Sequence, residues 1–410
     1  MRDPQVGIVN LPLEGRSNLA STAKPNSGGC GQQSNHHPSR NSPSPLAPRI
    51  PISPQGAGSQ PRTLRRPAEL VAAGLADAGS LPALETVAAR YAVAITPDMA
   101  ELIDPADQSD PIARQFVPDP AELASTAEDV ADPIGDDVHE VFPGLIHRYP
   151  DRVLLKFTSV CPVYCRFCFR REMVGKGGAS ILSEAELDAA LDYVRADPNL
   201  WEVIVSGGDP LIAAPRRIAQ MVDAFGAVDH VKVVRFHTRV PVVAPVRITS
   251  DLVAALQAPS VATWVAVHVN HPRELTDDAR AALGRLVDAG IPLVSQTVLL
   301  RGVNDDADTL GTLMRALVEA RVKPYYLHHG DLAPGTGHFR TTIAEGQDIV
   351  RRLRGRYSGL CQPTYILDIP GGHGKVPVGP CHIAEANDGY EVVDFHGDTH
   401  GYHESRVSKV

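Results

Sequence analysis

The sequence has few cysteines, no excess of basic residues and no long hydrophobic run. Its 410 residues include six cysteines, too few for a scaffold held by disulfides. The formal net charge of −9 argues against a general nucleic-acid or membrane-surface binder. No run reaches the roughly 18 apolar residues of a spanning helix, and the N-terminus lacks signal-peptide features. We therefore expect a cytoplasmic protein with neither nucleic acid nor membrane as partner.

Four regions follow one another along the chain. Residues 1–65 are rich in Ser, Pro, Asn and Gly without apolar periodicity, so we expect a disordered tail. Apolar residues at helical spacing predict a helical region over 66–145. We assign 146–360 to a barrel domain and 361–410 to a lysine-bearing loop with a C-terminal extension.

The barrel assignment depends on short β-branched runs that alternate with helix-length amphipathic stretches. Repeated strand–helix units of this kind build a parallel sheet, and six or more predict a full or partial (β/α) barrel. The expected class is α/β, with a partial barrel preceded by the helical region and the tail. The expected strands are VLLKFTS, EVIVSGG, VKVVRFHT, TWVAVHV, PLVSQTVLL, PYYLHHGD and TYILDIPGG.

Six of these runs end in polar side chains, which are Ser206, His237, His268, Gln296, Asp331 and Asp368. Any one of them could be an ordinary strand–loop transition. Six in register favour a functional site, because barrel enzymes carry their sites at the C-terminal ends of the strands.

Half of the cysteines lie in one short loop after the first expected barrel strand, at Cys161, Cys165 and Cys168. Thiolates held close together select zinc or an iron–sulfur cluster. A structural zinc site needs a fourth Cys or His at matched spacing, and none is near. Three ligands therefore favour a cluster with one iron open to a further ligand.

The stretch ILDIPGGHGKVPVGP carries a second signal. A phosphate-binding P-loop is excluded, because Ile369 and Val376 stand where Gly and Ser or Thr are required. A glycine-rich turn with a solvated lysine is one alternative. The other is that Lys375 forms a Schiff base with an aldehyde cofactor.

Together these motifs resemble the radical S-adenosylmethionine (SAM) enzymes and, within them, the lysine 2,3-aminomutase family. The resemblance runs from about residue 110 to 385 and is far more specific than any one motif. It includes HRYPDRVLL, CRFCFRRE, SGGDPL, HVNHPRE, QTVLLRGVND, KPYYLHHGDL and GTGHFRT.

The resemblance implies a role for each matching residue. Cys161, Cys165 and Cys168 would hold a [4Fe–4S] cluster whose open iron binds SAM. The residues near SAM would be Ser206, Gly207, Gly208, Asp209, His268 and Gln296.

The resemblance also implies pyridoxal 5′-phosphate (PLP) on Lys375, with its phosphate held by Arg148 and Arg152. Arg170 would bind the substrate α-carboxylate. Asp331 and Asp368 would embrace a side-chain ammonium, because two buried carboxylates need a cation between them. We therefore expect an isomerase that converts L-lysine to β-lysine through a 5′-deoxyadenosyl radical.

Two positions depart from the lysine enzymes of the family. Phe169 stands where a small polar residue is usual, and His328 where tyrosine is usual. The alternatives are an aminomutase for arginine or a similar amino acid, an elongation-factor-modifying homologue, a radical SAM enzyme without PLP, or a non-catalytic metal-binding protein. We also expect a homo-oligomer, a flavodoxin- or ferredoxin-type electron donor, and a solvated tail that carries His396, His400 and His403.

Overall fold

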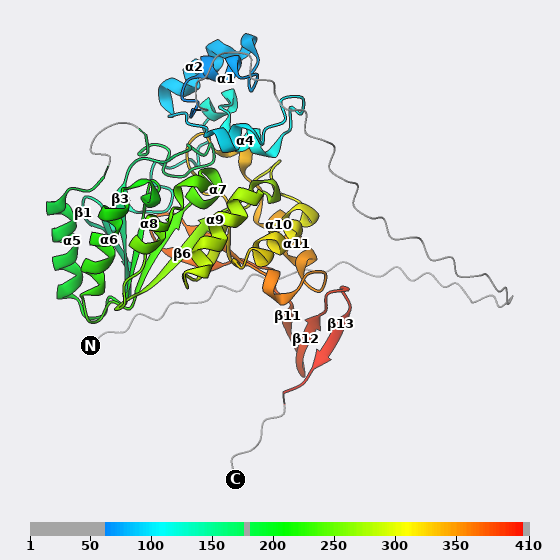
Figure 1. Ribbon diagram of the computed structural model, residues 1–410. Helices are drawn as coiled ribbons and strands as arrows, with labels where there is room; N and C mark the ends of the chain where they lie inside the picture. Colours follow the sequence, from blue (N-terminus) through cyan, green and yellow to red (C-terminus); the bar gives the residue numbers. More distant parts are fainter. Residues whose placement is uncertain (1–61, 176–180, 405–410) are drawn as a thin grey trace, which may run out of the picture. The chain divides into compact units, whose positions relative to one another are not determined.

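A ten-stranded sheet whose strands follow one another in sequence order forms the centre of the fold (Figure 1). The computed structural model describes residues 62–175 and 181–404. The strands of the sheet are β1 (Glu140–Phe142), β2 (Leu145–Tyr149), β3 (Arg152–Thr158), β4 (Glu202–Gly207), β5 (Val233–Thr238), β6 (Ala262–His268), β7 (Leu293–Val298), β8 (Lys323–His328), β9 (Thr364–Ile369) and β10 (Gly374–Pro377).

The strands from β3 to β9 pair in parallel, and they correspond to the seven runs expected from the sequence. The short strands at both ends pair antiparallel, β1 and β2 before β3 and β10 after β9. Within the described residues β1 and β10 each have one neighbour, so the sheet does not close. The expected partial barrel is confirmed.

Helices connect the parallel strands and bury one face each. The helix α5 begins after Ser183, whose hydroxyl accepts a hydrogen bond from the Glu186 amide, while the Glu186 carboxylate accepts one from the Ser183 amide. This is the expected capping box. Leu187, Leu191 and Val194 form the buried face of the helix. The connecting helices are α5 (Glu184–Ala196), α6 (Pro215–Gly226), α7 (Val240–Val243), α8 (Ser250–Ala255), α9 (Asp277–Asp288), α10 (Ala307–Glu319) and α11 (Ile343–Leu353).

One continuous apolar core lies between the sheet and these helices. Val203, Val205, Phe157 and Phe236 on the parallel strands are fully buried, as expected for strands covered on both faces. Truncating a phenylalanine of this kind to alanine costs about 3–5 kcal/mol. The core therefore gives the strand ends a rigid base.

The segment before the sheet is helical in part. It contains α1 (Pro67–Ala72), α2 (Leu81–Arg90), α3 (Pro97–Ala100) and α4 (Pro111–Phe116), and Leu64 forms an isolated antiparallel bridge with Ile95. The disorder expected for the N-terminal tail falls on residues that lie, up to position 61, outside the described part of the chain.

The segment after β10 forms a separate antiparallel sheet of β11 (Ile383–Ala386), β12 (Gly389–Val393) and β13 (Thr399–Tyr402). Most of its side chains are exposed. His400 on β13 lies 2.9 Å from the Asp394 carboxylate, measured from Nε2 to Oδ2. No helix among the residues described is long and apolar enough to cross a membrane.

Candidate active site

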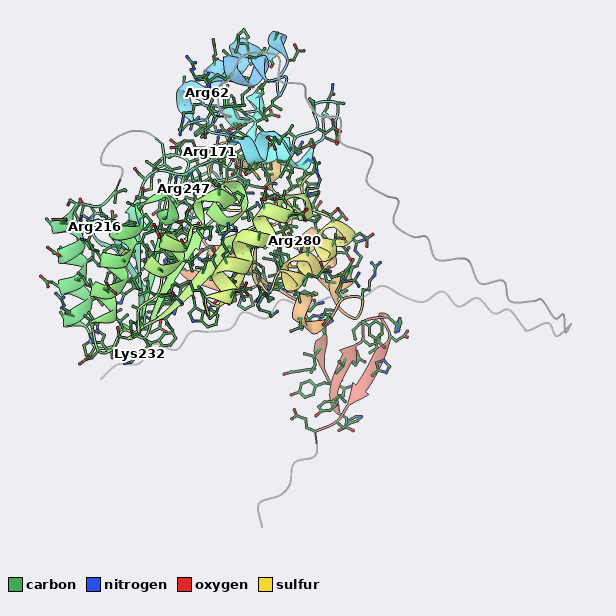
Figure 2. All side chains as sticks on the ribbon, in the orientation of Figure 1. Arg62, Arg171, Arg216, Lys232, Arg247 and Arg280 are labelled. Atoms are coloured by element: carbon green, nitrogen blue, oxygen red, sulfur yellow. The ribbon has the colours of Figure 1, made fainter. Side chains whose placement is uncertain are left out.

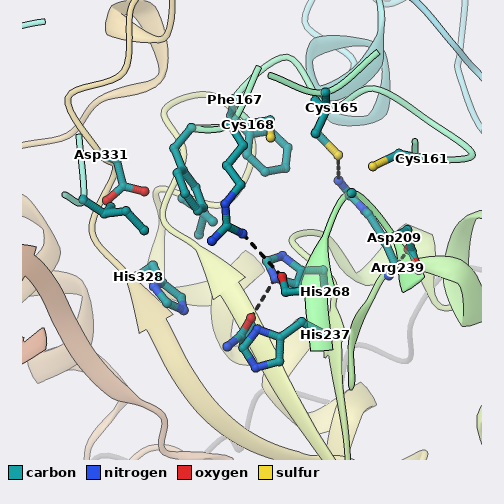
Figure 3. A pocket seen from close by; sticks show the side chains of 18 of the residues that line it. Cys161, Cys165, Phe167, Cys168, Asp209, His237, Arg239, His268, His328 and Asp331 are labelled. Carbon is teal, nitrogen blue, oxygen red and sulfur yellow. Dashed lines mark hydrogen bonds between the residues drawn. The ribbon is translucent and has the colours of Figure 1, made fainter. Parts of the chain in front are cut away.

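A pocket opens at the C-terminal ends of the parallel strands. Each strand from β3 to β9 contributes residues to its lining, and the antiparallel strand β10 adds Lys375. The empty space in it, which includes the open mouth, is about 1350 Å³. In Figure 3 the three cysteines lie along the upper edge, with Asp331 across from them and His237 and His268 below. The predicted site residues that line it are Cys161, Cys165, Cys168, Arg170, Ser206, Gly207, Gly208, Asp209, His268, Gln296, Asp331, Asp368 and Lys375.

The three cysteines are half-buried free thiols. Burial raises the pKa of each thiol, that of Cys168 to about 11, so bound iron would have to take the place of their protons. Among the described residues no three His, Cys, Asp or Glu side chains converge to hold one metal ion. In a cluster each cysteine binds a different iron, so the three thiols need not converge on one ion.

Glycines bring the end of β4 against the start of the cysteine loop. A Cβ at Gly207 would lie 2.4 Å from the Thr158 carbonyl oxygen, and one at Gly208 would lie 2.4 Å from that of Val160. Gly207 also has a positive φ of 105°, which favours glycine. The two glycines are therefore required for this close approach.

Asp209 joins the loops that follow β4 and β5. Its carboxylate is 4% exposed and accepts hydrogen bonds from the Thr238 hydroxyl at 2.6 Å and the Arg239 amide at 2.7 Å. Burial raises the pKa of Asp209, although these donors oppose the shift. The contact with the SAM amino group expected for Asp209 stays a prediction.

Two arginines of the cysteine loop share one buried carboxylate. Glu122, in a short turn at Pro120–Leu123, is fully buried and accepts hydrogen bonds from Arg166 and Arg171. Arg171 is buried, whereas Arg216 on α6 is an exposed arginine; both are labelled in Figure 2. The positive charge beside the thiols is therefore partly structural. The sequence did not single out Glu122, because a lone glutamate looks like a surface residue.

A chain of charged groups leads from the cysteine loop to the lysine. Arg170 donates to Asp136 at 2.8 Å and to the Ser206 hydroxyl at 3.3 Å, and Arg148 donates to Asp136 at 3.1 Å and to Asp368 at 3.2 Å. Burial opposes ionisation of Asp136, but Arg170 and Arg148 lower its pKa. No pattern in the sequence pointed to Asp136.

The predicted phosphate ligands lie outside the lining of the pocket. Arg148 is engaged with the two aspartates, and Arg152 lies 2.5 Å from Asp151 and stacks over the Tyr149 ring at 3.8 Å. Their role toward a phosphate therefore stays a prediction.

Lys375 lies on a strand, where the sequence predicted a loop. In the antiparallel pair of β9 and β10 it is the register partner of Asp368, and its ammonium contacts the Asp368 carboxylate. The Lys375 amide donates to the Tyr149 hydroxyl at 2.9 Å. A Cβ at Gly372 would lie 2.8 Å from His139, so glycine lets this turn pack against the chain before β1.

Asp331 is the second carboxylate at this end of the pocket. Burial, with a further contribution from the charge of Asp368, raises the pKa of Asp331 to about 7. Lys375 and Arg148 both pair with Asp368. Asp331, when ionised, would bind a further cation favourably.

Three histidines form the floor of the pocket. Burial lowers the pKa of His268 to about 4 and lowers those of His237 and His328 well below the usual value, so all three are neutral at pH 7. His268 and Gln296 are hydrogen-bonded at 2.7 Å. In the part of the chain that the structure describes, the buried Nε2 atoms of His237 and His328 have no hydrogen-bond partner. Such atoms fit a polar cofactor or substrate in the pocket.

Comparison with known proteins gives these features a context. The Radical SAM superfamily model matches residues 155–313. The L-lysine 2,3-aminomutase of Clostridium subterminale is 43% identical over 306 residues, which are 74% of this chain and 73% of that protein. The glutamate 2,3-aminomutase of Clostridioides difficile is 35% identical over 307 residues, 75% of this chain and 72% of that protein. The chain thus belongs to the lysine 2,3-aminomutase family of radical SAM enzymes.

Proposed function

We propose that this radical SAM aminomutase moves the 2-amino group of L-lysine to C3 and releases β-lysine, with PLP bound at Lys375. Family membership makes the protein an isomerase that uses a [4Fe–4S] cluster and SAM. The choice of lysine and the use of PLP are supported by the charges that line the pocket.

The pair of Asp331 and Asp368 is the observation that carries the substrate assignment. Both carboxylates line the pocket, and the Lys375 ammonium neutralises Asp368. Arg148 also pairs with Asp368, so Asp331 is the carboxylate more open to a substrate cation. The side-chain ammonium of lysine would supply that cation. A side-chain carboxylate, as in glutamate, would be repelled.

Arg170 is placed to bind the α-carboxylate of the substrate. Its guanidinium is 9% exposed and lines the pocket between the cysteines and Ser206. It has five N–H groups, and those that Asp136 and Ser206 do not engage can bind a carboxylate. The α-carboxylate would then lie near the cysteines and the ammonium near Asp331.

When bound, SAM and the cluster supply a carbon-centred radical, and PLP supplies the aldehyde that carries the migrating amino group. The protein contributes position, charge and exclusion of water. Phe167, Phe169, Val298, Leu300 and Phe339 line the pocket, and these apolar groups keep water from a reactive radical.

Three further features stay predictions. They are a flavodoxin- or ferredoxin-type electron donor, homo-oligomeric assembly and cytoplasmic location. Phe169 and His328 depart from the usual residues of the lysine enzymes. If the enzyme acts on another amino acid, we expect these two residues to contribute to the change of substrate.

The proposal is tested with anaerobically reconstituted protein, SAM, PLP and dithionite. L-Lysine, L-arginine and L-glutamate are offered in parallel, and β-amino products are separated by chromatography and identified by mass. We expect β-lysine alone. Turnover of arginine or glutamate without turnover of lysine would overturn the substrate assignment, and turnover of lysine without PLP would overturn the PLP assignment.

A further inference from the structure

Arg239 follows β5 and reaches one of the three cysteines. Its Nη1 donates to the Cys165 sulfur at 2.8 Å, shown by a dashed line in Figure 3, and its Nη2 donates to Gln115 and Glu274, both at 2.6 Å. Its backbone amide donates to Asp209 at 2.7 Å. The side chain of Arg239 is 7% exposed. The guanidinium is therefore held at three points, one of which is a cysteine sulfur.

The acceptors of Arg239 are themselves fixed. Glu274 is fully buried, and its second oxygen accepts hydrogen bonds from the amides of Asn270 and His271 and from the side chain of Gln115. Gln115, on α4, is also fully buried. A guanidinium held by groups of this kind cannot swing away when the charge on its sulfur partner changes.

The other arginines of this region are directed elsewhere. Arg166 and Arg171 donate to Glu122, and Arg170 donates to Asp136 and Ser206. Arg239 comes from a different strand and approaches the sulfur from the side of β5. Its position therefore differs from that of Arg170, the arginine expected to bind the substrate.

We propose that Arg239 sets the reduction potential of the cluster by donating its N–H to the Cys165 thiolate, with Glu274 limiting the effect. One-electron reduction adds one negative charge to the cluster and its thiolates. A fixed positive charge and an N–H···S hydrogen bond stabilise that added charge more than the oxidised state. The electron comes from a one-electron donor, and no proton is needed for balance.

Glu274 opposes Arg239, because its negative charge lies beside the same guanidinium. Removing the positive charge should lower the potential, and removing the negative charge should raise it. A general disturbance of the pocket would not produce opposite shifts. The inference depends on the cluster that the family implies and is independent of lysine as substrate.

The test is a redox titration of reconstituted protein without SAM or substrate, with dithionite as reductant and the reduced cluster counted by electron paramagnetic resonance. Arg239→Met should reduce the equilibrium constant for reduction about tenfold, a fall of about 59 mV for one electron. Arg239→Lys keeps the positive charge but lacks the planar guanidinium, so the reduction potential of this variant should fall by less. Glu274→Gln should shift the potential upward.

Arg235→Met is the matched control. Arg235 lies on β5, the strand that Arg239 follows, and pairs with Glu202 at 2.9 Å, and both side chains are mostly buried. This variant should keep the wild-type potential. If Arg239→Met does not hold a cluster, Arg239→Lys and Glu274→Gln still test the proposal by the signs of their shifts.

Two results would overturn the proposal. The first is an unchanged potential in the Arg239 variants that hold a cluster. The second is a shift of the same sign in Arg239→Lys or Arg239→Met and in Glu274→Gln. Because no substrate is present, failure of the lysine assignment would leave this test unaffected.

Discussion

Lys375 and Asp368 face each other as register partners across the antiparallel pair of β9 and β10, and their side chains form an ion pair inside the pocket. Asp368 also accepts from Arg148, which connects it through Asp136 to Arg170. One short strand pair thus places the predicted cofactor lysine beside a predicted substrate ligand.

Lys375→Ala should abolish PLP binding, because no other lysine lines the pocket within the described residues. Wild-type protein incubated with PLP and freed of excess cofactor should retain the absorbance of a lysine-bound PLP. The variant should lose it together with aminomutase activity.

Lys323→Ala is the control for that experiment. Lys323 begins β8, at the end of the strand opposite to the pocket, and its ammonium donates to the Leu360 and Gln362 carbonyls. This variant should keep both the absorbance and the activity. Retention of lysine-bound PLP by Lys375→Ala would show that the cofactor lysine is elsewhere.

Replacing Cys161, Cys165 or Cys168 with alanine should prevent assembly of the cluster. Iron content after anaerobic reconstitution should fall from about four atoms per chain toward zero. The iron content of Cys381→Ala should equal that of the wild type, because Cys381 is exposed and lies after β10. Wild-type iron content in any of the three loop variants would remove that cysteine from the ligand set.

The pKa of Asp331, raised to about 7, predicts a pH dependence of lysine binding. The carboxyl is mostly neutral at pH 6 and mostly ionised at pH 8, and the ionised form attracts the substrate ammonium. The affinity for L-lysine should therefore fall as pH falls below 7, by up to about tenfold per pH unit because one proton must leave on binding.

Asp331→Asn should bind lysine more weakly at pH 8 and lose this dependence. The Michaelis constant for lysine, measured from about pH 5.5 to 8.5, reports both effects. Asp348→Asn, which changes an exposed carboxylate on α11, should behave as wild type. A slope that persists in Asp331→Asn would assign the titration to another group.

Glu122→Gln should destabilise the protein, since it leaves Arg166 and Arg171 without their buried counter-ion. Breaking a buried ion pair of this kind costs about 3–5 kcal/mol, which denaturant unfolding of the cluster-free protein would detect. Glu101→Gln, at an exposed position, should stay within about 0.5 kcal/mol of wild type. Equal stability of the two variants would exclude a structural role for Glu122.

The sequence predicted the parts of the fold that depend on periodic patterns. The seven parallel strands are β-branched runs, and the capping box at Ser183 placed the start of α5. The motifs at the strand ends predicted the pocket, because parallel strands bring their C-terminal ends together.

The parts that the sequence did not predict depend on isolated residues or short elements. The strand β1 has three residues and β10 has four, and β10 ends at Pro377, which weakens any strand signal. Asp136, Glu122 and Glu274 are single carboxylates whose partners lie far away in sequence. Such pairs become visible only when the chain is folded.

The most direct test of the central claim follows the migrating nitrogen itself. L-Lysine labelled with ¹⁵N at the 2-amino group and ¹³C at C3 is incubated anaerobically with reconstituted protein, SAM, PLP and dithionite, and the product is examined by NMR. We predict β-lysine in which C3 shows one-bond coupling to ¹⁵N, because the nitrogen that leaves C2 becomes bonded to C3. Absence of a β-amino product, or β-lysine without that coupling, would contradict the proposed function.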